Sequence, residues 1–154
     1  MLHEERLAQV KDYLKSAPKT SKVYIGCDSS RKKDRETGFW FATYTTVVVI
    51  HVENSKGCKV FCETEIKRDY DKEARKPSLR MMNEAYCVVE AYGQLEEELL
   101  EFDVEAHLDI NPDPMYGSSC AYGSAKGYVA GVTGLEVKTK PEAFAASYAA
   151  DRYN

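Results

Sequence analysis

The sequence predicts an α/β fold built on a mixed five-stranded sheet, with three antiparallel strands first and two further strands that alternate with helices. Three successive segments in the first half of the chain repeat apolar residues with a period of two, which is typical of strands. The second half switches between helical periodicity and short strands, which favours helices packed on the sheet. The length of 154 residues suits one such domain with a substantial core.

The first half begins with an amphipathic segment. Residues 4–15 place apolar side chains at helical spacing before a polar stretch that contains a proline, and this predicts a helical leader over residues 1–21. The main domain is then expected over residues 22–154. Its first strand is followed by a predicted polar turn that begins at Arg31. The three expected strands span residues 22–30, 39–52 and 58–67.

The second half predicts a long helix that starts at Ser78 and ends near Phe102. Within residues 117–131, three glycines four apart predict a small-residue helix face that packs closely against a neighbour. The remaining expected elements are strands at 104–110 and 135–140 and a final alanine-rich helix from 141 to the end.

The composition excludes a membrane-spanning protein, since no apolar run approaches the roughly 20 residues that a transmembrane helix needs. The first residues are charged and lack the apolar core of a secretory signal. Five cysteines form no CxxC pair, which fits reduced thiols. These observations predict a cytoplasmic protein.

The net charge of −4 hides a strong segregation of charge along the chain. Residues 31–80 hold twelve Lys and Arg against eight Asp and Glu, whereas residues 84–113 hold ten acidic residues and no Lys or Arg. A basic segment of this kind is able to contact phosphates, although a solvated loop is an equally good interpretation of it.

Two aspartates follow apolar strand residues. Asp28 comes at the predicted end of the first strand, and Asp109 comes near the end of the strand at 104–110. A single aspartate in such a place is most often a turn residue or a member of an ion pair. Two carboxylates at the ends of neighbouring central strands, however, are able to meet and to bind a cation.

Helix geometry adds two more carboxylates. At 100° per residue, Glu84 shares a helix face with the apolar residues Val88 and Leu95, whereas Glu90 falls on a polar face and is expected at the surface. In the final helix, Asp151 lies beside an apolar stripe, with a frayed terminal charge as the alternative interpretation.

Convergence of Asp28, Glu84, Asp109 and Asp151 would require cations. Oxygen ligands without a His or Cys set favour Mg²⁺ or Mn²⁺. Two such ions about 4 Å apart stabilise both the attacking and the leaving oxygen in phosphodiester hydrolysis. The predicted catalytic and metal-binding residues are these four carboxylates.

Several segments resemble, in order, the YkuK-like family of ribonuclease H-like proteins. They are VYIGCDSS, the helical NEAY, the strand HLDIN, the segment GYVAG and the closing KTKPEAFAASYAAD. The resemblance covers the chain from about residue 22 to its end. It implies a ribonuclease H-like fold, and the carboxylate pattern of the family falls on the same four residues.

The resemblance and the basic segment together indicate a nucleic-acid partner, RNA or DNA. The predicted substrate-binding residues are Ser29, Ser30, Arg31, Lys32 and Lys140, the last being the lysine of the family-like Lys-Pro pair. The leading hypothesis is a metal-dependent nuclease. The alternatives are an inactive nucleic-acid-binding or assembly module on the same fold, and a phosphohydrolase of small molecules.

Overall fold

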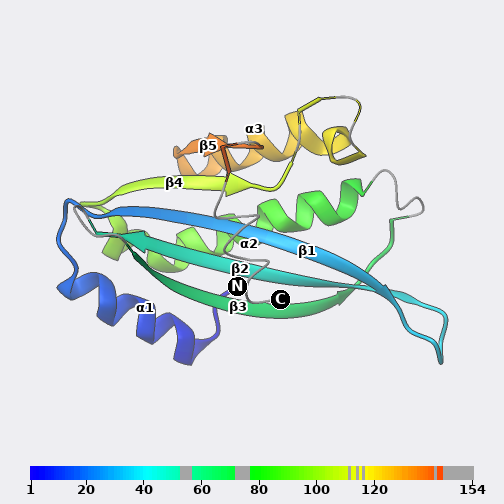
Figure 1. Ribbon diagram of the computed structural model, residues 1–154, viewed down its shortest axis with the longest axis horizontal. Coiled ribbons are helices and arrows are strands. Elements are labelled where there is room, and N and C mark those ends of the chain that lie inside the picture. Colours follow the sequence, from blue (N-terminus) through cyan, green and yellow to red (C-terminus); the bar gives the residue numbers. More distant parts are fainter. Residues whose placement is uncertain are drawn as a thin grey trace.

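The computed structural model describes residues 1–52, 57–71, 77–110, 112–113, 115, 117–140 and 142–143. This part of the chain contains four helical and five extended elements in alternating groups (Figure 1). In chain order they are α1 (Glu4–Ser16), β1 (Lys22–Lys33), β2 (Trp40–His51), β3 (Cys58–Arg68), α2 (Ser78–Leu99), β4 (Asp103–Leu108), the short 3₁₀ helix η1 (Gly117–Ala121), α3 (Tyr122–Thr133) and β5 (Glu136–Lys138).

The strands form one mixed sheet in the order β3-β2-β1-β4-β5. β1, β2 and β3 pair antiparallel, whereas β4 runs parallel to β1 and β5 runs parallel to β4. β2 and β3 are therefore added at one edge of β1, and β4 and β5 are added at its other edge. The predicted fold class and its five-stranded mixed sheet are confirmed.

The helices α1, α2 and α3 contribute to the same hydrophobic core as the inner residues of β1 and β2. Val23, Ile25 and Cys27 of β1 are completely buried in this core, and they alternate with residues of the opposite face. Figure 1 shows α1 next to β3, α2 across the sheet and α3 next to β4. The opposite face carries a smaller apolar cluster around Val47 and Val49.

The buried face of α2 is the one that helical spacing predicts. Val88, Ala91 and Leu95 are fully buried, and Glu84 shares their face with an exposed fraction of 1%. Glu90 is exposed, as predicted. Because the apolar stripe fixes the rotation of the helix, it also fixes the direction in which Glu84 points.

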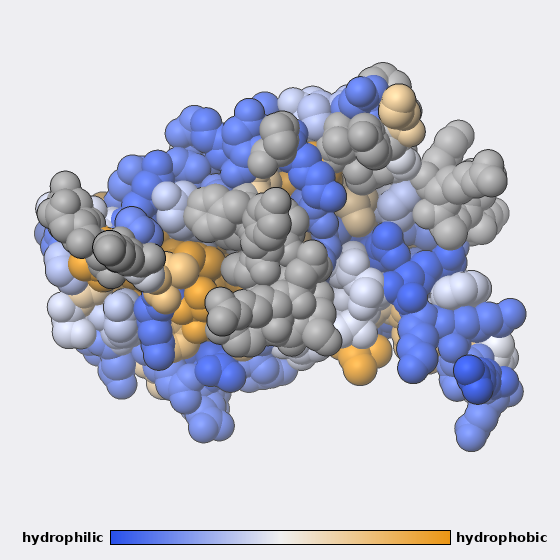
Figure 2. Space-filling model, in the orientation of Figure 1, coloured by the Kyte–Doolittle hydropathy of each residue, from blue (hydrophilic) through white to orange (hydrophobic). Residues whose placement is uncertain are grey.

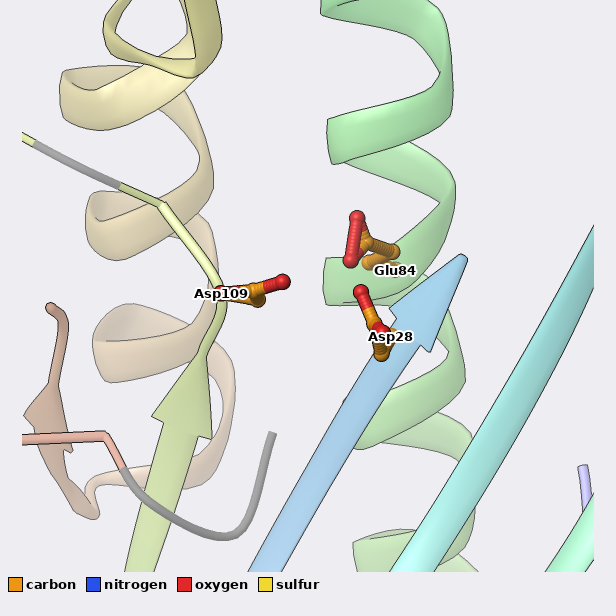
Figure 3. Close-up of side chains that lie close together, drawn as sticks. All are labelled: Asp28, Glu84 and Asp109. Atoms are coloured by element: carbon orange, nitrogen blue, oxygen red, sulfur yellow. The ribbon is translucent and has the colours of Figure 1, made fainter. Parts of the chain in front are cut away.

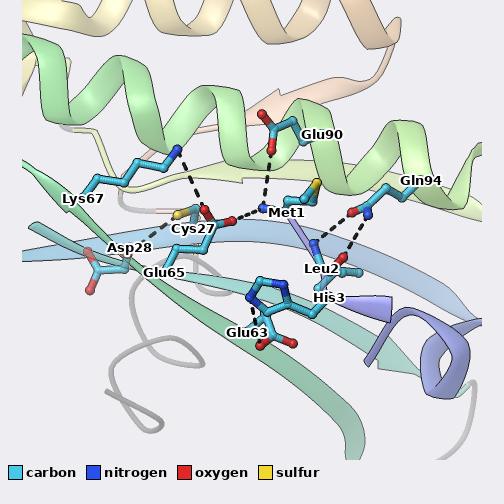
Figure 4. A network of polar contacts seen from close by, with 10 residues as sticks. All are labelled: Met1, Leu2, His3, Cys27, Asp28, Glu63, Glu65, Lys67, Glu90 and Gln94. Carbon is cyan, nitrogen blue, oxygen red and sulfur yellow. Dashed lines mark hydrogen bonds and ion pairs between the residues drawn. The ribbon is translucent and has the colours of Figure 1, made fainter. Parts of the chain in front are cut away.

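α1 is held on the body of the protein by its start and by its apolar stripe. Val10 and Leu14 are fully buried in the core shared with α2. The backbone of Leu2 makes two hydrogen bonds of 2.9 Å with the amide of Gln94, one in each direction (Figure 4). The division into a leader and a main domain stays a prediction.

Two details differ from expectation. β1 continues to Lys33 because residues 31–33 pair with Trp40, Phe41 and Ala42 of β2, where a polar turn beginning at Arg31 was predicted. In α3, Gly123, Gly127 and Gly131 are exposed, and a β-carbon at each would contact nothing within 4 Å. α3 packs through Ala125 and Val129 instead, so the predicted close-packing glycine face is wrong.

The final helix predicted from residue 141 lies almost entirely outside the described residues. Among the helices that the structure describes, none combines the length and the apolar character that crossing a membrane requires.

Replacing Leu14 with Ala is expected to lower the free energy of unfolding by about 2–5 kcal/mol, because the side chain is fully buried between α1 and the core. Urea denaturation of this variant measures the loss. Lys15→Ala is the control, since its side chain is exposed. A change below about 0.5 kcal/mol in Leu14→Ala would show that α1 contributes little to the stability of the domain.

Candidate metal centre

The site lies where the parallel ladder between β1 and β4 ends. Cys27 and Leu108 form the last pair of that ladder, and Asp28 and Asp109 are the next residues of the two strands. β1 continues beyond this point along β2, whereas β4 ends. From β1 the chain continues to β2 and β3 on one side, whereas β4 and β5 lie on the other side. Open α/β sheets bind ligands at such a switch point, beyond the carboxyl ends of the strands.

Three carboxylates meet at this point: Asp28 of β1, Glu84 of α2 and Asp109, which follows β4. One oxygen from each lies within 4.8 Å of the other two. Figure 3 shows the three side chains directed toward one another from separate elements. Each of the three residues therefore offers one oxygen atom to a common point where a metal ion could bind.

The cluster forms around the edge of β1. Cys27 and Ser29 face the core side of the sheet, and the alternation of the strand places Asp28 on the other side. Glu84 approaches from α2 on the core side. Because β4 no longer covers the edge of β1 beyond Cys27, the two carboxylates are able to meet there.

Glu84 is the most deeply buried carboxyl of the cluster. Burial raises the pKa of its carboxyl well above the usual value, and the nearby charges of Asp28 and Asp109 raise it further. Arg80, one turn earlier on α2, and a hydrogen bond from Ser29 act in the opposite direction. Burial dominates, so the carboxyl is held toward its neutral form in the absence of a cation.

Two neighbours partly satisfy the carboxylates. The Ser29 hydroxyl donates a hydrogen bond of 3.2 Å to Glu84 Oε2. The Lys140 ammonium lies 2.8 Å from Asp109 Oδ1, and this contact raises the pKa of Lys140. The second oxygen of Glu84, Oε1, is buried and accepts no hydrogen bond from the described residues.

The chemistry of these donors fits a hard divalent cation. Carboxylate oxygens are the ligands that Mg²⁺ and Mn²⁺ prefer, and the described cluster contains no thiolate or imidazole. The buried Oε1 of Glu84 is a polar atom that such a cation would satisfy. Asp151, the fourth predicted carboxylate, lies outside the described residues.

Arg31 makes several contacts within the protein, and its predicted contact with substrate stays a prediction. Its Nε atom lies 2.5 Å from Asp69 Oδ2, and its Nη2 group donates a hydrogen bond of 2.8 Å to the Asp71 carbonyl oxygen. The guanidinium also stacks on Trp40, 4.2 Å from the ring centroid. Asp71 in turn accepts two backbone hydrogen bonds from the first turn of α2. Arg31 therefore connects β1 to the start of the helix that carries Glu84.

The other predicted substrate residues differ in their surroundings. Ser30 and Lys32 are exposed beyond Asp28 on β1. Ser29 and Lys140 contact the carboxylates, so they are placed to position the cluster. Arg80 was not among the predicted site residues, although its position four residues before Glu84 on one helix face was a signal for it.

A known protein family matches nearly the whole chain. A family model described as Ribonuclease H-like matches residues 5–154. No curated protein and no solved structure matches the chain.

Glu84→Gln is expected to stabilise the metal-free protein at neutral pH by about 1 kcal/mol, which raises Tm by about 3 °C. The pKa of Glu84 is higher in the folded state than in the unfolded state. The free energy of unfolding of the parent therefore falls as the pH rises from the unfolded pKa through the folded pKa. The gain should therefore disappear below about pH 4, where both states are protonated. Thermal denaturation in EDTA across this pH range measures it.

The control for this variant is Glu96→Gln, an exposed position of α2, which should leave Tm unchanged. A lower Tm for Glu84→Gln at neutral pH would contradict the electrostatic account of the site.

Arg31→Ala is expected to lower the free energy of unfolding by about 3 kcal/mol, because it leaves the carboxylate of Asp69 buried without its ion-pair partner. Lys32→Ala, the exposed neighbour, should change it by less than about 0.5 kcal/mol. Urea denaturation distinguishes the two variants. Equal stabilities would show that the Arg31 network does not support α2.

Proposed function

Because the chain belongs to the Ribonuclease H-like family, we propose that it is a nuclease that hydrolyses phosphodiester bonds in RNA or DNA with two divalent metal ions, Mg²⁺ or Mn²⁺. The predicted family resemblance is confirmed at this level, while membership of the YkuK-like group stays a prediction. The proposal depends on one observation above all: three carboxylates lie within 4.8 Å, and one of them is completely buried.

Asp28, Glu84 and Asp109 would hold the metal ions, and the proposal keeps Asp151 as a fourth ligand. Bound metal ions would lower the pKa of a water molecule and stabilise the charge on the attacking and leaving oxygens. The Ser29 hydroxyl fixes the orientation of the Glu84 carboxylate through its hydrogen bond to Oε2. Ser30 and Lys32 face solvent beyond Asp28 and are proposed to contact the substrate.

Lys140 favours a second candidate function. Its ammonium already places a positive charge 2.8 Å from Asp109 and thereby offsets part of the negative charge of the cluster. A protein that keeps this lysine in place of a metal ion would be an inactive nucleic-acid-binding or assembly module. The two functions differ in whether divalent cations bind the protein as it stands.

Replacing Asp28 or Asp109 with Asn is expected to lower cleavage of RNA or DNA substrates at least about 100-fold, because each change removes a metal-binding charge without changing the size of the side chain. The assay follows cleavage of single-stranded, duplex and hybrid oligonucleotides with Mg²⁺ or Mn²⁺. Glu96→Asn, a surface change on α2, serves as the control. Full activity in either aspartate variant would contradict the proposed mechanism.

Thermal denaturation with and without Mn²⁺ separates the two candidate functions. Under the nuclease proposal Mn²⁺ raises the Tm of the parent, because a ligand that binds the folded state stabilises it. Under the alternative, the parent does not respond and Lys140→Ala gains a response, since the change removes the resident positive charge. We predict that Mn²⁺ raises the Tm of the parent.

A further inference from the structure

The hairpin of β1 and β2 carries a groove that the metal centre does not use. It has a volume of about 480 Å³ and lies on the sheet face opposite to α2. We call it the hairpin groove. Its lining contains three cations, two carboxylates and a mainly apolar remainder, namely Lys32, Lys33, Asp34, Arg35, Glu36, Phe41, Thr43 and Ile66. Figure 2 shows that the surface at this end of the molecule is mainly hydrophilic.

We propose that the hairpin groove binds a single-stranded segment of nucleic acid that continues into the metal centre. The identity of the polymer as a nucleic acid depends on the proposed function. The location of the groove, its charge and its apolar surface support the proposal independently of one another.

The groove begins two residues beyond Ser30 on the same face of β1 that carries Asp28. β1 pairs with β2 in an uninterrupted register, so Asp28, Ser30 and Lys32 follow one another on the same face. At about 3.3 Å per residue, Lys32 lies about 13 Å from Asp28 along the strand. A chain bound in the groove therefore reaches the carboxylates within a few nucleotides.

The charge of the lining suits phosphates. Lys32, Lys33 and Arg35 supply three cations, against Asp34 and Glu36. The Asp34 carboxylate is turned to its own loop, where it accepts hydrogen bonds from the Thr37 hydroxyl and from the backbone N–H of Glu36. These bonds lower the pKa of Asp34 and keep it ionised. Three cations and two carboxylates therefore give the lining a net charge of +1, and the cations face solvent.

The apolar lining favours unpaired bases over a duplex. Ile66 is 69% exposed beside the half-buried ring of Phe41. Opposite Phe41 on β3, Arg68 stacks on the exposed rings of Phe39 and Tyr70, at 3.6 and 5.1 Å from their centroids. Flat aromatic and guanidinium surfaces bind single strands by stacking on the bases, whereas a duplex presents mainly phosphates.

The test measures binding by fluorescence anisotropy in EDTA, so that it does not depend on metal binding or cleavage. The probe is a fluorescein-labelled single-stranded RNA or DNA oligonucleotide of about 12 nucleotides. The double variant Lys32→Ala/Lys33→Ala should weaken binding about 25-fold at 0.1 M salt and reduce the slope of log K against log salt by about 1.4. Phe41→Ala should weaken binding about tenfold while leaving that slope unchanged.

The matched control is Lys15→Ala/Lys59→Ala, which removes the same charge from exposed positions outside the groove. Circular dichroism confirms that each variant is folded. The proposal is overturned if the groove variants bind like this control, if the parent does not bind the probe, or if the groove variants lose duplex binding and keep single-strand binding.

Failure of this proposal is distinguishable from failure of the proposed function. If the parent cleaves oligonucleotides while the groove variants bind normally, the nuclease proposal stands and the groove proposal is rejected. If the parent binds through the groove but cleaves nothing with Mg²⁺ or Mn²⁺, the groove proposal stands. That result would favour the inactive binding module over the nuclease.

Discussion

The mutual repulsion of three carboxylates, one of them completely buried, is the constraint on which the rest of the site depends. Taking Glu84 out of water next to Asp28 and Asp109 holds its carboxyl toward the neutral form. Buried acidic groups are rare unless a partner offsets their charge. A divalent cation removes both the repulsion and the cost of burial, which is why the arrangement is better suited to binding a metal than to stabilising the fold.

The scaffold holds this unfavourable arrangement through features that lie outside it. The end of the β1–β4 ladder leaves the edge of β1 open at Asp28, so that carboxylates from both sides of the sheet can meet. The apolar stripe of α2 fixes the direction of Glu84, and Arg31 with Asp71 secures the first turn of the same helix. Lys140, which follows the edge strand β5, offsets part of the negative charge of the cluster.

Much of this was predictable from local patterns, because periodicity reports which side chains share a face. The period of α2 placed Glu84 with the core. The strand pattern placed Asp28 and Asp109 on neighbouring strands, although Asp28 lies inside β1 and not at its end as predicted. Pairing between distant residues has no such local signal. β1 extends past Asp28 because residues 29–33 pair with residues 40–44 of β2. The contact of Lys140 with Asp109 depends on how the loop after β5 meets the end of β4.

Calorimetric titration of the protein with Mn²⁺ tests the central claim most directly, because it asks whether the buried cluster is a metal site without requiring a substrate. The account predicts saturable binding accompanied by proton release, since the raised pKa of Glu84 means that a cation must displace a proton. Asp28→Asn should abolish this binding. Absence of saturable binding by the parent, or equal binding by Asp28→Asn, would contradict the account.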